Sequence, residues 1–239
     1  MTIDGFDVSR IGIRQWNFTP GYSELKNESE WLEGTKLPLM VEGKTGFKKI
    51  KVVVMVKGAN RQEIWERGGK LMSMLYGPVT LKIDGFKHYF KAVLNNRGQA
   101  EDSLNRFHRA TLEFLTYEFG EEKVVSKTNA REIEIVNEGT LETPAVIEIM
   151  PTMGKESLTI TGITRDKFTK EEVPTVIKKL SFGKKIVIDG EDSLITEGGT
   201  NKFKDTIIYS FPSLLPGENT IILDQDDINI TVRYKPMFV

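Results

Sequence analysis

The sequence predicts a mainly β protein with one helix, in which an antiparallel α+β domain is followed by a β-sandwich. Short runs rich in β-branched and aromatic residues recur along the chain between turn-forming residues, which is typical of strands. The clearest run is Ile228–Tyr234, where Ile228, Ile230 and Val232 alternate with polar residues, as in a half-buried strand. Residues 60–76 differ, because their apolar side chains recur at helical spacing.

Composition excludes several classes of function. The chain has 239 residues, a net charge of −1 and no cysteine. A near-neutral charge gives no sign of binding to nucleic acid or to anionic membranes. Without cysteine there are no disulfides, no thiolate catalysis and no Cys-ligated zinc. No apolar run approaches the roughly 20 residues of a membrane helix, and the first residues lack a signal-peptide pattern. We expect a protein that is made in a reducing cytosol.

The first residues combine an expected strand with a long irregular excursion. Val8, Ile11 and Ile13 predict a first strand or strand pair. From Asn17 to Gly46 the pattern weakens, and glycine and proline interrupt it repeatedly. We interpret this stretch as a long loop with one short strand around residues 37–41. Loops of this length in compact domains are usually functional or disordered.

A strong strand and the helix follow. Residues 49–57 predict a strand with one apolar face at Ile50, Val52, Val54 and Val56, and the opposite face is also partly apolar. Asn60 is the expected N-cap of the helix.

Ile64, Leu71, Met72 and Leu75 share one face of this helix, and Trp65 lies beside them, so we expect the Met and Trp side chains to be core. The pair Gly68–Gly69 costs roughly 1 kcal/mol per glycine relative to alanine. Such a pair permits a kink or lets another backbone approach closely.

A hairpin and one more strand complete the first domain. Gly77–Pro78 ends the helix, and residues 79–83 and 86–94 predict two strands around an Asp84–Gly85 turn. Residues 106–119 predict the last long strand. We therefore predict an α+β domain over residues 1–130, an antiparallel β-sandwich plus helix, with a polar join that begins at Gly120.

The second half shows strand signals without a helical segment. Strands are expected at residues 132–136, 143–150, 158–164, 176–182, 184–188 and 194–195, and in three runs between 206 and 234. Pro216–Gly217 suits the centre of a type II turn, in which glycine supplies the positive φ. This spacing predicts a β-sandwich over residues 131–239.

Several phrases stand in order along this second half: Asn137-Glu-Gly-Thr140 before Thr143-Pro144, Ile186-Val-Ile-Asp189, Phe211-Pro-Ser-Leu214, Leu215-Pro-Gly-Glu-Asn219 and the closing Arg233-Tyr234. Together they resemble the distal tail protein family of long-tailed, non-contractile bacteriophages. In the first domain the resemblance rests on the order of elements alone. It covers the whole chain, although no single phrase is diagnostic.

The resemblance implies a structural protein of the virion. Proteins of this family form a hexameric ring at the lower end of the tail, with the tail-tube protein above, the tail-tip or fibre protein below, and DNA passing through the lumen. The first domain builds the ring, with residues 17–46 as the arm and residues 60–76 as the ring helix, and the second is a galectin-like β-sandwich. The resemblance implies assembly in the host cytoplasm of a phage or prophage, with no membrane and no sequence-specific nucleic acid as partner.

No residue is predicted to be catalytic, cofactor-binding or metal-ligating, so we expect no enzyme and no cofactor. His88 and His108 fall in predicted strands, outside any catalytic motif. Asp224-Gln-Asp-Asp227 begins like a calcium loop but has Asn229 where that loop needs glycine and Lys235 where it needs glutamate.

The alternative function is a carbohydrate-binding module of a phage or prophage adhesion device. The tryptophans that would stack on a sugar, at positions 16, 31 and 65, all lie in the first half.

Overall fold

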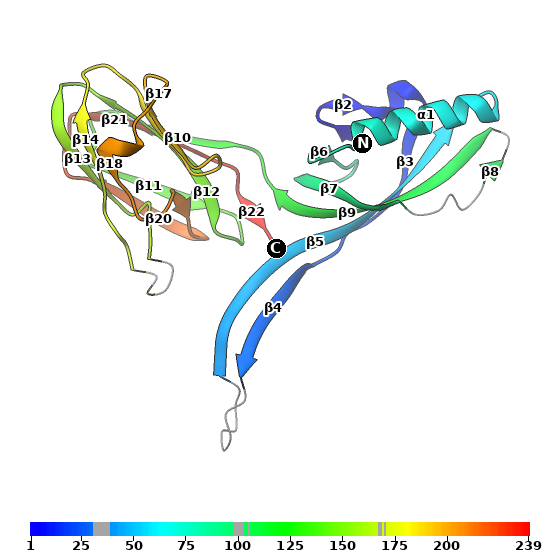
Figure 1. Ribbon diagram of the computed structural model, residues 1–239, viewed down its shortest axis with the longest axis horizontal. Coiled ribbons are helices and arrows are strands. Elements are labelled where there is room, and N and C mark those ends of the chain that lie inside the picture. Colours follow the sequence, from blue (N-terminus) through cyan, green and yellow to red (C-terminus); the bar gives the residue numbers. More distant parts are fainter. Residues whose placement is uncertain (31–38, 98–102, 105, 167–168, 170) are drawn as a thin grey trace. The chain divides into compact units, whose positions relative to one another are not determined.

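The computed structural model describes residues 1–30, 39–97, 103–104, 106–166, 169 and 171–239 (Figure 1). The chain divides into two compact units, Met1–Phe119 and Gly120–Phe238. This division falls before the predicted boundary at residue 130, because strand β10 (Lys123–Lys127) pairs with β21 (Ile228–Tyr234) of the second unit. That the units are separate domains in solution stays a prediction.

An antiparallel sheet with the strand order β2-β1-β6-β7-β9-β5-β3 forms the first unit, with β4 added to β5 and β8 added to β9. Its elements are β1 (Thr2–Ile3), β2 (Phe6–Asp7), the 3-10 helix η1 (Val8–Ile11), β3 (Ile13–Thr19), β4 (Ser23–Glu30), β5 (Leu39–Lys57), α1 (Arg61–Met74), β6 (Val79–Lys82), β7 (Tyr89–Arg97), β8 (Ser103–Leu104) and β9 (Phe107–Phe119).

The sheet curls around its core. Gln15 of β3 donates to the carbonyl of Asp84 at 3.3 Å and accepts from the Asp84 amide at 2.9 Å, so the edge strand β3 lies against the β6–β7 turn. The Phe18 ring contacts Phe86, with 4.4 Å between centroids. The predicted inward face of β5 is confirmed, because Ile50, Val52, Val54 and Val56 are all buried.

The predicted helix is confirmed, with one error. The Asn60 side chain accepts the Glu63 amide at 2.9 Å, as an N-cap does, and α1 buries Ile64 and Leu71 in the core of the unit. Trp65 was expected in that core, yet it is 79% exposed. One residue along a helix turns the side chain by about 100°, which carries Trp65 away from the buried face.

Two other expectations for the first unit are wrong. Residues 8–11 form η1 instead of a strand, because the Asp7 carboxylate accepts the Ser9 amide and Gly12 ends the turn at φ 75°. The expected excursion at residues 17–46 is largely a strand pair, β4 with the first part of β5. Of the short strand expected at residues 37–41, positions 37 and 38 lie outside the described residues.

The Asp84–Gly85 turn is present, but it is wider than a two-residue hairpin. Gly85 has φ 86°, and the Phe86 amide donates to the Ile83 carbonyl at 3.2 Å. Strand pairing begins only at Lys82 opposite Tyr89. His88 therefore precedes β7 and does not lie within it.

The second unit is a sandwich of two antiparallel sheets. One has the order β10-β21-β12-β15-β16-β17 and the other β11-β20-β13-β14-β18, while β19 pairs with β12. The further elements are β11 (Glu132–Asn137), β12 (Thr143–Pro151), β13 (Lys155–Thr161), β14 (Thr175–Leu180), β15 (Ile186–Asp189), β16 (Leu194–Glu197), β17 (Thr200–Asn201), η2 (Phe203–Asp205), β18 (Thr206–Ile207), β19 (Ser213–Leu214), β20 (Gly217–Leu223) and β22 (Met237–Phe238).

The inward residues of both sheets form one core. Ile147 and Ile149 of β12 pack with Ile133, Ile221 and Ile230 from neighbouring strands, and all are buried. The predicted β-sandwich is thus confirmed. A mainly β fold with one α-helix holds for the part of the chain that the structure describes.

Buried asparagines explain two of the recognisable phrases. The Asn137 amide group donates to the Leu214 carbonyl at 3.2 Å, and its oxygen accepts the Gly139 amide at 3.0 Å. The Asn219 side chain accepts the Leu215 amide and donates to the Leu215 carbonyl, both at 2.8 Å. Each asparagine closes a loop whose backbone groups would otherwise lack partners. Gly217 has φ 89°, the positive value predicted for it.

Candidate assembly interface

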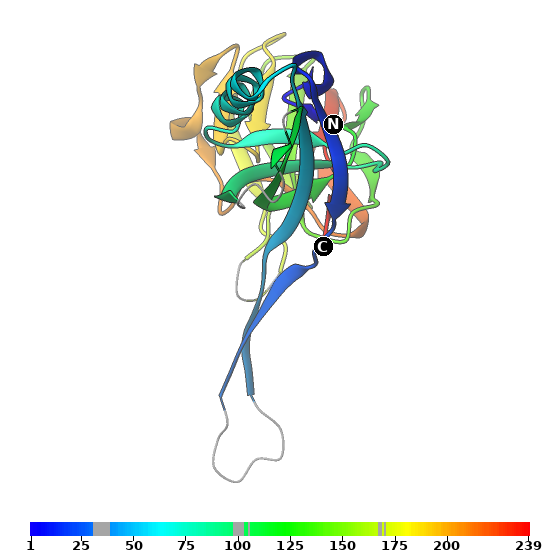
Figure 2. The ribbon, with the colours of Figure 1, turned by 90° about the vertical axis from the view of Figure 1, so that its right-hand side faces the viewer.

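Strand β5 belongs to two structures at once. From Lys48 to Lys57 it pairs with β9, and from Leu39 to Lys48 it pairs with β4. β4 and the first part of β5 form a two-stranded ribbon, which Figures 1 and 2 show leaving the sheet of the first unit. We call residues 23–30 and 39–47 the arm. At about 3.3 Å per residue, the eight residues of β4 span roughly 26 Å.

Close backbone packing fixes the point where the arm leaves the sheet. A Cβ added to Gly21, between β3 and β4, would lie 1.9 Å from the Lys49 carbonyl oxygen. Such a contact is far inside van der Waals distance and involves backbone on the β5 side. Only glycine fits there without a shift of the strand.

A cluster of charged side chains lies at the same point. Lys48 is buried and pairs with Glu118 of β9, and Glu118 also contacts His88 at 2.6 Å. The alternation of β5 places Lys48 on the face of Ile50, so period-two spacing could have identified it as inward-facing. A buried charge that loses its partner is strongly destabilising. The ion pair between Lys48 and Glu118 therefore holds β5 against β9 at the residue where the arm begins.

The outer face of α1 carries exposed aromatic side chains. Trp65 is 79% exposed, and Tyr76, just beyond the helix, is 94% exposed. An added Cβ at Gly68 or Gly69 would meet nothing within 4 Å among the described residues. No neighbour in the described chain therefore explains the glycine pair.

A buried ion network orders one edge of the second unit. Lys202 donates to Glu197 at 2.9 Å and to the Lys179 carbonyl at 2.8 Å. The Ser181 amide donates to the other Glu197 oxygen at 2.8 Å. Burial raises the pKa of Glu197. The hydrogen bonds from the Ser181 amide and from Lys202 lower this pKa by more than burial raises it, so it lies below the ordinary value of 4.5. The network joins β14, β16 and η2 and has a structural role.

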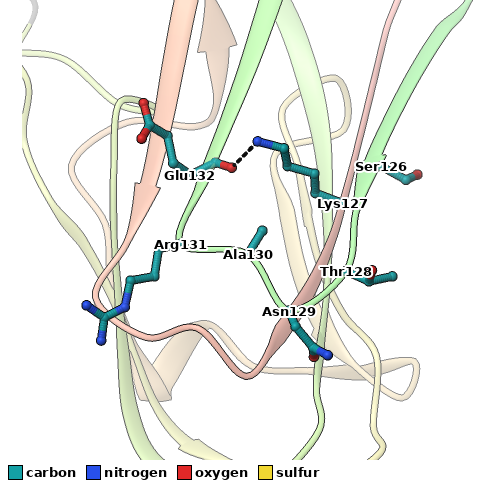
Figure 3. Close-up of a pocket in the computed structure, with 7 residues that line it drawn as sticks. All are labelled: Ser126, Lys127, Thr128, Asn129, Ala130, Arg131 and Glu132. Atoms are coloured by element: carbon teal, nitrogen blue, oxygen red, sulfur yellow. Dashed lines mark hydrogen bonds between the residues drawn. The ribbon is translucent and has the colours of Figure 1, made fainter.

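A hollow of about 610 Å³ lies over the loop between β10 and β11, where Asn129 has φ 46° (Figure 3). Lys127 donates to the Glu132 carbonyl at 3.0 Å, and Arg131 lies 3.8 Å from Asp226. Figure 3 shows the polar side chains of this loop pointing in different directions, so they do not form a binding constellation.

The described residues contain no cluster of His, Asp and Glu that could hold a metal ion. No helix among them is long and apolar enough to cross a membrane. His108 lies half-buried in β9, opposite Val56. In the loop that resembles a calcium site, the Asp227 carbonyl accepts the Thr152 amide at 3.1 Å.

Comparison with known proteins identifies the chain's relatives. Residues 138–238 match the family described as siphovirus-type tail component, C-terminal domain, of the SPP1 Dit type. No curated protein sequence matches significantly.

Three solved structures share the fold. The crystal structure of SPP1 Dit has a TM-score of 0.79 at 12% identity, with 99% of this chain and 98% of that chain covered. That protein is described as a paradigm of the hub adsorption apparatus in phages that infect Gram-positive bacteria. Two structures of the phage p2 baseplate in its activated conformation, with Ca and with Sr, give TM-scores of 0.53 and 0.54 at 12% and 13% identity. Each covers 98% of this chain and 94% of the other.

The matched residues 138–238 make up most of the sandwich that carries the recognised phrases, and the Dit fold extends over both units. Residues 138–238 therefore form a C-terminal domain of the siphovirus-type tail component family, of the SPP1 Dit type.

Proposed function

We propose that six copies of this chain form a closed ring through the first unit, and that the ring is the hub between the tail tube and the tail tip. The observation that carries the proposal is the arm. Residues 39–47 of β5 pair with β4 alone among the described strands, and β4 pairs with β5 alone. Both outer edges of the ribbon therefore have unused backbone donors and acceptors, to which a neighbouring copy can add a strand.

A head-to-tail contact of this kind closes into a ring when the rotation between copies permits. The number six comes from the family resemblance, and so does the order of partners. The tail-tube protein lies above, the tail-tip or fibre protein lies below, and DNA passes through the lumen. The whole-length likeness to SPP1 Dit, described as a hub adsorption apparatus, supports this arrangement.

The test compares the full chain with two arm variants. In the first, residues 26–44 are replaced by Asn-Gly, which joins the paired residues Leu25 and Thr45 through a tight hairpin. In the matched control, Asn-Gly replaces only residues 31–38, so the paired residues Glu30 and Leu39 remain. Each protein is examined by negative-stain microscopy and sedimentation, at high concentration and with the cognate tail-tip protein.

We expect rings from the full chain and from the control, and folded monomers from the arm-shortened variant. A full chain that stays monomeric under every condition would refute the ring. Rings formed by the arm-shortened variant would leave the ring standing and refute only the role of the arm.

A further inference from the structure

The sheet of the first unit has one face that no described element of the unit covers. The core lies on the other side, where α1 packs against the inward residues of β5 and β9. The uncovered face consists of the outward residues of β5, β9 and β7. Register places Val93 of β7 opposite Leu115 of β9, and Leu115 opposite Lys49 of β5. We call these outward residues the open sheet face.

The centre of the open sheet face is apolar. Phe47, Val93 and Tyr117 are 47%, 46% and 41% exposed, and the rings of Phe47 and Tyr117 lie 4.7 Å apart. Leu115 lies half-buried among them. Apolar side chains that are adjacent on an exposed sheet, and not scattered singly, are typical of an interaction surface.

Charged residues, most of them basic, surround this centre. The outward basic residues of the three strands are Lys49, Lys51, Lys57, Lys91 and Arg109, whereas Glu113 is the outward acidic residue. Lys51 pairs with Glu113 at 2.7 Å, and Lys49 pairs with Glu24. Lys91 stands opposite Tyr117 and has no ion-pair partner among the described residues. The face is therefore basic with an apolar centre.

We propose that the open sheet face is the docking surface for an acidic protein surface of another tail component. An apolar, aromatic centre with a polar rim is the usual anatomy of a protein–protein interface, and a basic rim selects an acidic partner. A second copy of the first unit is a poor occupant, because residues 1–119 contain 18 Lys and Arg against 14 Asp and Glu. Nucleic acid is disfavoured because the apolar centre offers nothing to phosphates. The inference rests on the proposed place of this chain in the phage tail, and not on the ring.

The test measures binding of the full chain to the purified tail-tube and tail-tip proteins of the same phage, by calorimetry at about 50 mM and about 500 mM salt. The variants are Lys91→Glu and Val93→Ser, both on the face. The matched control is Lys178→Glu, which makes the same charge change at an exposed position of β14 in the second unit. Circular dichroism confirms that each variant is folded, and sedimentation follows its assembly.

We expect one of the two proteins to bind the wild type and the control equally. Lys91→Glu should weaken this binding at least tenfold at low salt and less at high salt, and Val93→Ser should weaken it at both. Equal binding by wild type and both variants overturns the proposal, as does a wild type that binds neither protein.

Loss of ring assembly in the variants would make the face a contact between copies. Loss of binding to a duplex of about 20 base pairs, with protein binding kept, would make it a nucleic-acid surface.

Discussion

Single side chains hold the irregular parts of the second unit in place. Asn137 and Asn219 each satisfy several backbone groups of a loop, and both are buried. Lys202 and Glu197 form an ion pair whose side chains are only 9% and 11% exposed. An ion pair this buried is held by surrounding hydrogen bonds, so removal of one partner leaves the other charge without compensation.

The Glu197 network makes stability depend on pH. The folded pKa of Glu197 lies below its ordinary value, so its contribution to stability is present above that value and is lost as pH falls through the folded pKa. Wild type should therefore be more stable than Glu197→Gln at pH 7, and this difference should shrink as pH falls below 4.5. Urea unfolding at pH 7, 5 and 3.5 measures both proteins.

The same substitution at Glu134, which is exposed on β11, controls for the removal of a carboxylate in general. If the difference between wild type and Glu197→Gln were the same at pH 7 and pH 3.5, the ion pair would not be a source of acid sensitivity.

At the scale of the element, the sequence predicted strands and the helix wherever burial imposes a period. Ile228–Tyr234 was predicted with its observed bounds, and the alternation of Ile50 to Val56 gave the inward face of β5. Strands β4 and β10 were missed. Polar residues predominate in both strands. A strand is recognisable in a sequence when one of its faces is buried, because burial makes apolar residues alternate with polar ones.

The sequence indicated which residues form the candidate interface, but not that they form strands. The interrupted pattern between Asn17 and Gly46 marked the arm, yet it was interpreted as a loop. The partner change of β5 at Lys48 could not be predicted, because it depends on strand register between distant segments. Trp65 was assigned to the wrong face because an aromatic residue beside an apolar stripe is usually core.

The glycine pair of α1 allows a direct measurement on the helix. An added Cβ at Gly69 meets nothing within 4 Å in the described structure, and alanine favours the helix by about 1 kcal/mol over glycine. Gly69→Ala should therefore raise the free energy of unfolding of the monomer by roughly that amount. Chemical denaturation of dilute protein measures it, with the exposed Ser73→Ala in the same helix as the control for helix propensity.

A lower stability in Gly69→Ala would contradict the open space around this residue. A monomer that is more stable but assembles less well would show that another copy approaches the helix at this point.

At the scale of the whole molecule, the two units differ in charge and meet at a defined point in the chain. Residues 120–239 contain 15 Lys and Arg against 20 Asp and Glu, the reverse of the balance in residues 1–119. The polar join predicted from the sequence begins at Gly120, where the second compact unit also begins, and β10 lies within it. Whether β10 completes the second unit decides where that unit begins.

Two fragments distinguish the boundaries. One spans residues 120–238 and keeps β10, and the other spans residues 131–239 and follows the boundary predicted from the sequence. In the structure, residues Lys123 to Lys127 pair with Tyr234 to Ile230, and Val125 packs against the core of the sandwich. Without β10, the long strand β21 becomes an edge strand, and one flank of the core loses its cover. We expect the shorter fragment to be less stable by roughly 2 kcal/mol, from the lost valine burial and backbone hydrogen bonds.

Urea unfolding of both fragments measures the difference, with Val124→Ser in the longer fragment as a control at an exposed position of β10. Equal stabilities would place the start of the second domain at residue 131 and make β10 part of the linker.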